Sequence, residues 1–425
     1  MEQRRRIIWT LAAVLAVAFL LRLGNLGGPE LWGDEVLSTT AQYLPLEVLM
    51  RETSKAQTYV APVEPPGWHV LNRLAKPAIS DPTAAIYSFG GRTALRALPA
   101  LLGVLSVLML WLIARRLVEP RAAWVPAALL AVSFYGIYYS QENRPYSAVI
   151  FFALLSTWLY HETILRGRRR LWPLYGLSLA VPGYLTYPAV MVGLIHLVAF
   201  VVVWAGRRPL PGASDTPRKI GRKEIATFAF AGLLALVLFL PWLKHSLQMA
   251  IMPQLFHPVI ADGPGGKPGH VLISSLAHWG CGGWDSLAIY LPLAVLGLVA
   301  VWRRSSAYGI TFASFYLVGF AYVMLSTYGH MFHPRYLIFI FPMHQLLAGL
   351  GLVELARLAA AHIGKTPAET YARKWLVLIL LALALLAFRN FLPLGNYFEY
   401  QIKCSADNCP HAEFCREYIE PLWDD

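Results

Sequence analysis

Charge is scarce in this sequence. Only 14% of its 425 residues are Asp, Glu, Lys or Arg, against roughly 25% in an average soluble domain. Hydrophobic residues make up 57% of the chain, and the mean hydropathy is +0.50. They fall in uncharged runs, each close to the ~20 residues that a helix needs to span a bilayer. The composition therefore excludes an ordinary soluble domain and predicts an all-α integral membrane protein.

Features typical of nucleic-acid-binding proteins are also missing. The formal charge is +12 and the pI is about 9.5, but no stretch interleaves basic and aromatic residues in a way that suits nucleic acid. In a membrane protein, an excess of Lys and Arg is a topology signal, because these residues collect in cytoplasmic loops. No internal repeat and no low-complexity segment is evident. We predict membrane lipids as partners and no nucleic acid.

Uncharged runs predict about 11 membrane-spanning helices, within a range of about 10–13. They lie near Ile7–Leu23, Leu98–Leu117, Ala123–Tyr139, Tyr146–Leu165, Leu174–Pro188, Val190–Trp204, Phe228–Trp242, Leu287–Trp302, Ile310–Ser326, Tyr336–Leu355 and Trp375–Phe391. The first run is long for a signal peptide, and no small-x-small cleavage site follows it, so we expect a retained helix.

Basic residues occupy every second connection between these runs, which is the alternation expected for a cytoplasmic N-terminus. The basic groups are Arg4–Arg6, Arg115 and Arg116 with Arg121, Arg168–Arg170, Arg207 to Lys223, Arg303 with Arg304, and Arg373 with Lys374. Residues 1–391 then form a polytopic domain, with large extracytoplasmic loops at 24–96 and 244–286 and an extracytoplasmic tail at 392–425. In the first loop, Val36–Arg51 and Trp68–Ile79 suit helices that lie in the interface.

Cysteine is rare, and none of the four cysteines lies within a predicted span. Cys281, Cys404, Cys409 and Cys415 all fall in segments assigned to the outside, where an oxidising compartment allows two disulfides. Four cysteines permit three pairings, and the sequence does not choose among them. The spacing Cys-x4-Cys-x5-Cys in the tail is not a zinc pattern, so we favour disulfides over a metal site.

An acidic pair follows the first predicted span at close range. Asp34 and Glu35 come about ten residues after Leu23, and Trp32 is placed to anchor them at the membrane surface. Carboxylates at that position can accept a proton from a hydroxyl or bind a divalent cation such as Mg²⁺ or Mn²⁺. The alternative is a solvated loop with an acidic turn. No cofactor is predicted with certainty.

Three cations stand at the outer ends of predicted helices, namely Arg144, Arg335 and Lys244. Singly, each can be explained as a side chain that snorkels or touches lipid headgroups. Together, on the same side as the acidic pair, they indicate a phosphate site beside a base, because the guanidinium fork binds two phosphate oxygens. His69, His330 and His333 are candidates for metal binding or proton transfer, with a surface or packed role as the alternative.

These residues sit in motifs that resemble the polytopic C-type (GT-C) glycosyltransferases, which use polyprenyl-phosphate-linked sugars. Within that class the chain is similar to the dolichyl-phosphate-mannose protein mannosyltransferases and the lipid A aminoarabinose transferases. The motifs are Arg22-Leu23-Gly24 with Trp32-Gly33-Asp34-Glu35, then Glu64-Pro65-Pro66-Gly67-Trp68-His69, Leu95-Arg96-Ala97-Leu98-Pro99 with Ala114-Arg115-Arg116, Tyr139-Ser140-Gln141-Glu142-Asn143-Arg144-Pro145-Tyr146, Leu240-Pro241-Trp242-Leu243, and His333-Pro334-Arg335-Tyr336-Leu337. The order of these motifs along the chain and the spacing between them together support the resemblance.

The resemblance implies a GT-C-like fold and a glycosyltransferase, transferring a hexose or pentose with inversion. Asp34 would be the general base on an acceptor hydroxyl of a lipid, polysaccharide or protein. Arg144 and Arg335 would stabilise the leaving lipid phosphate, with Lys244 and Tyr336 as further donor-site residues. The same cavity would be lined by Glu35, Glu64, His69, Glu142, His330 and His333.

The chain departs from the family pattern at two places. Glu64 stands where the family commonly has His before the Pro pair, and only a short cysteine-bearing tail is expected after the helices. Two other functions stay open at this point: a transporter or flippase for a lipid-linked glycan, and a non-catalytic assembly subunit. We expect a bacterial inner membrane, with the site facing the periplasm or exterior.

Overall fold

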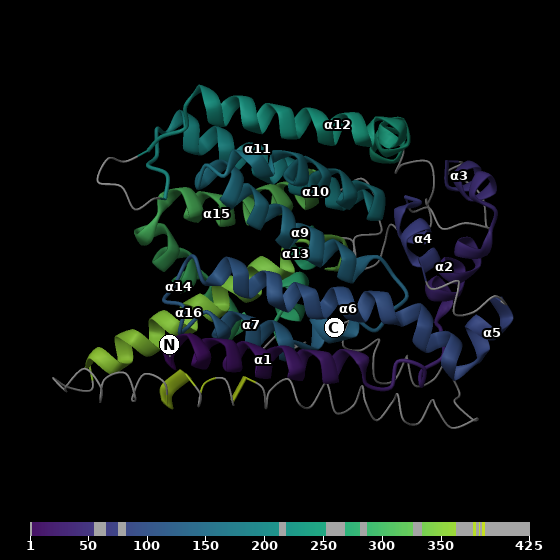
Figure 1. Ribbon diagram of the computed structural model, residues 1–425, viewed down its shortest axis with the longest axis horizontal. Coiled ribbons are helices and arrows are strands. Elements are labelled where there is room, and N and C mark those ends of the chain that lie inside the picture. Colours follow the sequence, from purple (N-terminus) through teal and green to yellow (C-terminus); the bar gives the residue numbers. More distant parts are fainter. Residues whose placement is uncertain are drawn as a thin grey trace.

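The computed structural model describes residues 2–54, 65–74, 82–211, 218–251, 268–280, 287–325 and 334–362, and beyond these only 377–379, 382 and 385–386. Every regular element within these residues is a helix, as Figure 1 shows. The predicted all-α fold is therefore confirmed for the part of the chain that the structure describes.

Seven helices in the described residues are long and apolar enough to cross a membrane. They are α1 (Glu2–Leu23), α6 (Phe89–Ala114), α9 (Tyr146–Tyr160) with its continuation η2 (His161–Leu165), η4 (Tyr187–Val190) with α11 (Met191–Ala205), α12 (Arg222–Ile251), α14 (Leu287–Arg304) and α15 (Ser306–Leu325). α1 packs against α6 and buries Val14, Ala18 and Arg22. The chain is thus an integral membrane protein.

Three further predicted spans are helical, but they are not among the seven helices that are long and apolar enough to cross a membrane. The run Ala123–Tyr139 splits into α7 (Trp124–Val132) and α8 (Phe134–Tyr138), because Ser133 leaves the helical conformation and its hydroxyl caps α8. α10 (Trp172–Leu185) and α16 (Phe341–His362) account for the other two, with the short helices η3 (Arg169–Leu171) and η8 (Pro334–Leu337) ahead of them. The run Trp375–Phe391 lies almost entirely outside the described residues.

The helices α14 and α16 pack most closely, at a pair of glycines. A Cβ on Gly297 would lie 2.0 Å from the Leu347 carbonyl oxygen, and one on Gly351 would lie 1.8 Å from the Leu293 carbonyl oxygen. Small residues allow such close approach of backbones in membrane proteins, where van der Waals packing drives helix association. Larger side chains at either position would push the two helices apart.

Short helices follow α1 at the end of the molecule where the acidic pair lies. They are α2 (Gly33–Tyr43), α3 (Leu46–Ser54), α4 (Gly67–Asn72) and α5 (Pro82–Tyr87), and α13 (Pro268–His278) belongs to the second large loop. The single interfacial helix predicted over Val36–Arg51 was wrong, because the chain breaks at Leu44 and Pro45 between α2 and α3. α4 confirms only the start of the second predicted helix, since 75–81 lie outside the described residues.

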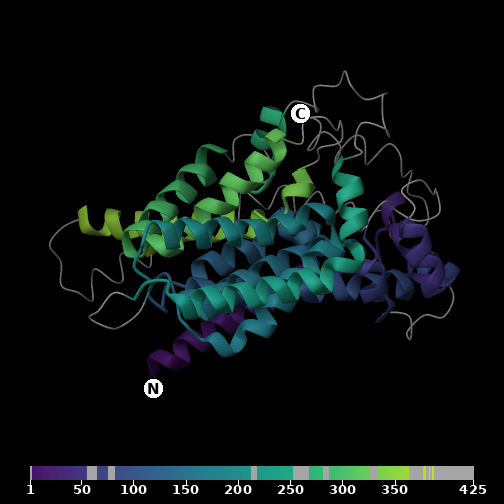
Figure 2. The same ribbon diagram turned by 90° about the horizontal axis from the view of Figure 1, so that it is seen from above.

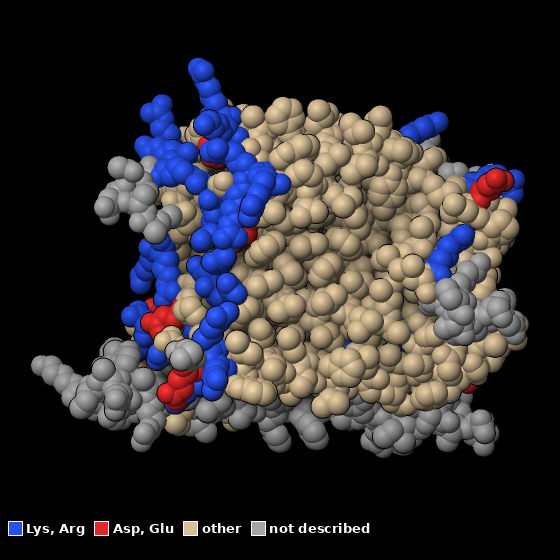
Figure 3. All heavy atoms as spheres, in the orientation of Figure 1, with Lys and Arg blue, Asp and Glu red and all other residues tan. Residues whose placement is uncertain are grey.

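The basic residues gather at the opposite end. Figures 1 and 2 both place α2 and α3 away from the end at which α1 begins. Figure 3 shows Lys and Arg concentrated where α1 begins, over the α6–α7, α11–α12 and α14–α15 connections. We name this the basic end and the opposite one the outer end. The positive-inside rule assigns the basic end to the cytoplasm.

Candidate active site

The first turn of α2 carries the acidic pair, and Glu35 points inward. Its side chain is only 1% exposed. The Arg96 guanidinium, from α6, donates from Nε to Oε1 at 2.9 Å and from Nη2 to Oε2 at 2.6 Å. The backbone N–H of Asn143 also donates to Oε1, at 2.6 Å. Both carboxylate oxygens of Glu35 are therefore engaged in a buried, bidentate ion pair.

Arg96 also holds the chain that enters α2. Its Nη1 donates to the carbonyls of Leu26 at 2.9 Å and Pro29 at 2.8 Å, and its Nη2 donates to that of Glu30 at 2.9 Å. One guanidinium thus joins α6, the segment after α1 and the first turn of α2. Arg96 lies in a family motif, but no function was predicted for it from the sequence. The signal was an Arg two residues before a predicted apolar run, where a buried charge is costly unless it is paired.

Asn143 connects the turn before α9 to two of the short helices. Its Nδ2 donates to Thr39 Oγ1 at 2.9 Å, and its Oδ1 accepts a bond from the amide of Asn72. The indole N–H of Trp68 donates to the Asn143 carbonyl at 3.3 Å. These contacts fix the turn against α2 and α4, so that the next residue, Arg144, is held beside Asp34.

A second set of bonds anchors the same turn to α1. The amide of Gln141 donates to the carbonyls of Leu21, Arg22 and Gly24 at 3.2, 3.1 and 3.1 Å. The buried guanidinium of Arg22 in turn donates to the carbonyls of Leu130 and Ala131 at 2.8 and 2.7 Å. These bonds satisfy carbonyls at the C-terminal ends of α1 and α7, which have no partner within their own helices.

Asp34 is the half-buried carboxylate of the pair. Its side chain is 32% exposed, and its Oδ2 lies 3.5 Å from Nη2 of Arg144 and 3.6 Å from Nη2 of Arg335. Arg144 is further fixed by Ser38 Oγ at 2.9 Å and by the Asp34 carbonyl at 3.2 Å. The structure therefore brings together Asp34, Arg144 and Arg335 from three separate segments, although Arg335 is distant in sequence.

Aromatic rings surround the Arg335 guanidinium. Its central carbon lies 5.8 Å from the ring centroid of Trp32, 5.9 Å from that of Tyr146 and 5.7 Å from that of Tyr336. At this range the ring faces attract a cation and limit its access to water. Tyr336, predicted as a donor-site residue, thus lies beside Arg335.

Two predicted cavity residues are buried beside this centre, and neither carries a charge at neutral pH. Burial, together with the charge of Arg144, lowers the pKa of the His69 imidazole to about 3. Burial and the nearby carboxylate of Glu35 raise the pKa of Glu142 to about 8. At pH 7 His69 is therefore a neutral imidazole and Glu142 is mainly a protonated acid.

Because the pKa of Glu142 is raised in the folded protein, we expect the stability of the protein to depend on pH. That pKa is higher in the folded protein than the roughly 4.3 of an unfolded chain, so the unfolded state releases its proton first as pH rises. The stability contribution is greatest below about pH 4 and is lost progressively up to about pH 8. We expect the melting temperature of Glu142→Gln in detergent to fall less than that of the unaltered protein between pH 5 and pH 9. Parallel curves would contradict this, and the exposed Glu119→Gln serves as the control.

Comparison with known proteins gives a family match over part of the chain. Residues 78–245 match the family model of dolichyl-phosphate-mannose-protein mannosyltransferases. The resemblance predicted from the motifs is confirmed. The match contains Arg96 and Arg144, whereas Asp34 and Arg335 lie outside it. A comparison with curated protein sequences found no match.

Solved structures of related transferases share the fold. The oligosaccharyltransferase AglB from Archaeoglobus fulgidus, in complex with an inhibitory peptide and a dolichol-phosphate, matches with a TM-score of 0.56 at 14% identity, over 96% of this chain and 57% of its own. ArnT from Cupriavidus metallidurans, bound to undecaprenyl phosphate, matches with a TM-score of 0.54 at 15% identity, over 94% of this chain and 76% of its own. This chain therefore spans little more than half the length of the archaeal enzyme.

Lys244 is the one remaining predicted site residue that lies within the described part of the chain, and it is not joined to this centre. Lys244 is exposed on α12, and no described contact connects it with Asp34. Glu64, His330 and His333 lie outside the described residues, as do Cys281, Cys404, Cys409 and Cys415. Their predicted roles and the disulfides stay predictions.

Within the described part of the chain, the residues around Asp34 do not form a divalent-cation site. No group of three or more His, Cys, Asp or Glu that could hold a metal ion is found within the described residues. Both oxygens of Glu35 are occupied by Arg96. Asp34 alone faces outward, and two guanidinium groups within 3.6 Å would repel a cation there.

Proposed function

We propose that this protein is a membrane glycosyltransferase that moves a sugar from a polyprenyl-phosphate carrier to an acceptor hydroxyl at the outer end of the membrane domain. The observation that carries the proposal is the half-exposed carboxylate of Asp34 between the guanidinium groups of Arg144 and Arg335. A base stands there beside two groups suited to bind phosphate. The family match and the lipid phosphates bound by AglB and ArnT support the donor class.

The charges of the centre suit a phosphodiester. Glu35 and Arg96 neutralise each other, and Glu142 and His69 are neutral at pH 7. Asp34 offsets one of the two remaining guanidinium groups, which leaves one positive charge. A sugar linked to a lipid through a phosphodiester carries one negative charge, so its binding brings the centre to neutrality. Because the phosphate competes for Arg144 and Arg335, it also releases the Asp34 carboxylate from its ion pairs with them.

The reaction then follows as a single displacement. The acceptor oxygen attacks the anomeric carbon, the bond from that carbon to the phosphate oxygen breaks, and Asp34 takes the hydroxyl proton. The leaving polyprenyl phosphate takes the electron pair and gains a second negative charge, which Arg144 and Arg335 stabilise more strongly than they stabilise the donor. One displacement at the anomeric carbon inverts its configuration.

Arg335 gives the direct test of phosphate binding. We expect Arg335→Gln to lower kcat/KM for the lipid-linked donor about 10–100-fold, because a charge-assisted hydrogen bond is worth about 1.5–3 kcal/mol. Arg335→Lys should recover only part of this, since an ammonium lacks the planar fork. Lys244→Gln, which removes an exposed cation from the same end, should change kcat/KM far less. Equal effects at the two positions would contradict the assigned phosphate site.

The proposed activity itself is tested in proteoliposomes. Purified protein is supplied with polyprenyl-phosphate-linked hexoses and pentoses, and both sugar transfer and released polyprenyl phosphate are measured. Translocation of the lipid-linked sugar without transfer would favour a flippase and overturn the proposal. Mass spectrometry of glycolipids, polysaccharides and glycoproteins from a deletion strain then identifies the sugar and acceptor class that disappear.

A further inference from the structure

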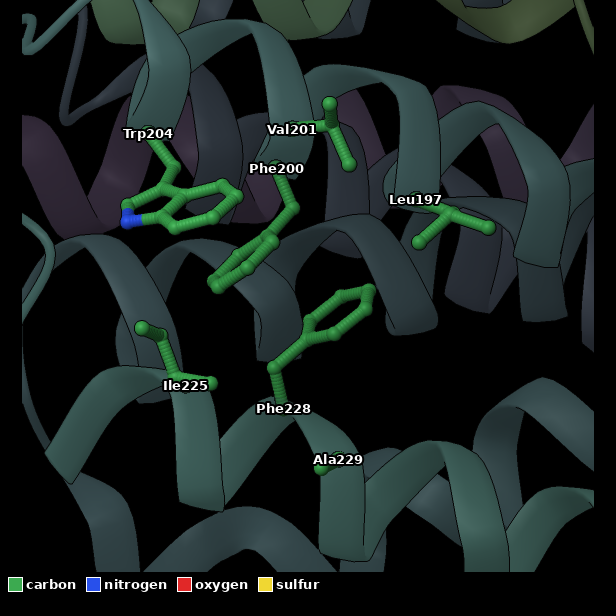
Figure 4. Close-up of a pocket in the computed structure, with 7 residues that line it drawn as sticks. All are labelled: Leu197, Phe200, Val201, Trp204, Ile225, Phe228 and Ala229. Carbon is green, nitrogen blue, oxygen red and sulfur yellow. The ribbon is translucent and has the colours of Figure 1, made fainter. Parts of the chain in front are cut away.

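An apolar groove lies between α11 and α12, away from the candidate active site. It has a volume of about 160 Å³ and is lined by Leu197, Phe200, Val201, Trp204, Ile225, Phe228 and Ala229. Figure 4 shows these side chains between the two helices. The rings of Phe200 and Phe228 stack with centroids 4.3 Å apart and planes 11° apart. The stacked pair fills the space between the helices and forms the floor of the groove.

The groove is elongated and open at the surface. Its lining on α11 runs from Leu197 to Trp204, which at 1.5 Å per residue is about 10 Å along the helix. Leu197, Val201 and Trp204 are 45%, 43% and 49% exposed. Both helices meet the criteria for membrane spans, so this surface faces hydrocarbon. Its shape suits a stretch of acyl chain rather than a compact ligand.

Exposed cations stand at the basic end of this groove. Arg207 and Arg208 follow α11, while Lys219, Arg222 and Lys223 lie at the start of α12. The Leu210 N–H donates to the Arg218 carbonyl at 2.7 Å, which joins the two ends of the α11–α12 connection. Arg222 precedes Ile225 by three residues and Ala229 by seven, so it shares their face of α12. We name these five cations the groove rim.

Other cations near the groove rim form ion pairs with carboxylates or donate to backbone carbonyls. Arg116, Arg166 and Arg168 lie 3.1, 3.5 and 3.0 Å from oxygens of the buried Glu162, and Arg169 pairs with Glu224 at 2.7 Å. Arg218 donates to carbonyls of residues 164–166. Among the described residues, no carboxylate forms an ion pair with the groove rim. Its five exposed side chains place positive charge at the basic end of the groove, where it can attract an anion.

We propose that the groove and its rim bind one anionic phospholipid of the cytoplasmic leaflet. One acyl chain lies along the groove, and the phosphate lies at Arg208 and Arg222. A basic cluster beside an apolar surface at the cytoplasmic side of a membrane helix attracts anionic headgroups. Each Lys or Arg increases the affinity for the lipid about fivefold. Surface charge alone does not fix the position at which a lipid binds. An acyl chain held in the groove would fix the lipid at this site. The inference does not rest on the proposed transferase activity.

Native mass spectrometry of the full-length protein tests this site. The detergent-solubilised protein is titrated separately with phosphatidylglycerol and with phosphatidylcholine of the same acyl chains. We expect one phosphatidylglycerol to be retained preferentially. Arg208→Gln/Arg222→Gln should weaken that binding about 25-fold, from two charges at about fivefold each. Ala229→Trp, which fills the groove from an exposed position, should weaken the binding of the same lipid while leaving the rim intact.

Arg4→Gln/Arg5→Gln is the matched control, because it removes two exposed cations from the basic end at a place away from the groove. It should leave retention unchanged. An equal loss in this control would show diffuse surface attraction and overturn the proposal. Equal retention of the two lipids would show ordinary boundary lipid and would overturn it as well. Melting temperatures of all variants, measured without added lipid, separate loss of the site from loss of the fold.

Discussion

Asp34→Asn is expected to lower kcat for sugar transfer about 10²–10⁴-fold, the range that a positioned general base contributes. The amide keeps the size of the carboxylate but cannot accept the hydroxyl proton. Donor binding should not weaken and should become tighter, because Arg144 and Arg335 lose the carboxylate that pairs with them in the free protein. The measurement is initial rate against donor concentration, with separate binding of the lipid phosphate product.

The split between kcat and donor binding distinguishes the base from a structural residue. A misfolded variant would lose both, so its melting temperature should stay within a few degrees of that of the unaltered protein. Glu119→Gln, which removes an exposed carboxylate at the basic end, should leave both quantities unchanged. Normal transfer by a folded Asp34→Asn variant would rule out Asp34 as the base.

Arg96→Met is expected to give the largest loss of stability, about 3–5 kcal/mol. The substitution leaves the Glu35 carboxylate buried at 1% exposure without its bidentate partner. It also removes the donors to the carbonyls of Leu26, Pro29 and Glu30. Transfer should be lost together with stability, since the first turn of α2 positions Asp34. Thermal unfolding in detergent measures the effect.

A double variant separates the buried charge from the missing hydrogen bonds. In Arg96→Met/Glu35→Gln no uncompensated carboxylate remains, so a substantial part of the stability should return. Activity should stay low, because the amide of Gln does not reproduce the charged pair that anchors the turn. Arg357→Met, which removes an exposed Arg that pairs with Glu354 three residues away, should cost less than about 1 kcal/mol. A single Arg96→Met variant with unaltered stability would contradict the assigned function of the pair.

The candidate site could be predicted only in part. The motifs placed Asp34, Arg144, Arg335 and Tyr336 in one centre, and the structure brings these four together. The resemblance gave the base to Asp34 and placed Glu35 in the cavity lining, but it did not reveal that Glu35 is fully engaged by Arg96 while Asp34 is half-exposed. Adjacent residues on a helix point in different directions, and which one meets a buried partner depends on the helix packed against it.

The same contrast holds for the fold. Hydropathy separated α10 from α11 correctly, and it placed α1, α6, α14 and α15, because burial in lipid depends on composition summed over a whole run. It did not reveal the breaks at Pro45 and Ser133, which turn one expected helix into two in each case. Pro45 disfavours the helical conformation at Leu44, and the Ser133 hydroxyl bonds to the backbone of α8; either residue changes the backbone without changing the average hydropathy.

The sequence by itself therefore determined the class of protein, the charge asymmetry between its two ends, the family resemblance and the residue types of the site. These are properties of composition, charge order and local motifs, which need no knowledge of neighbours in space. Only the tertiary structure decided that Arg96 pairs with Glu35, that Asn143 joins the turn to α2 and α4, and that two guanidinium groups converge on Asp34. Those contacts link residues far apart in the chain, and the packing of α1, α6 and α9 fixes their geometry.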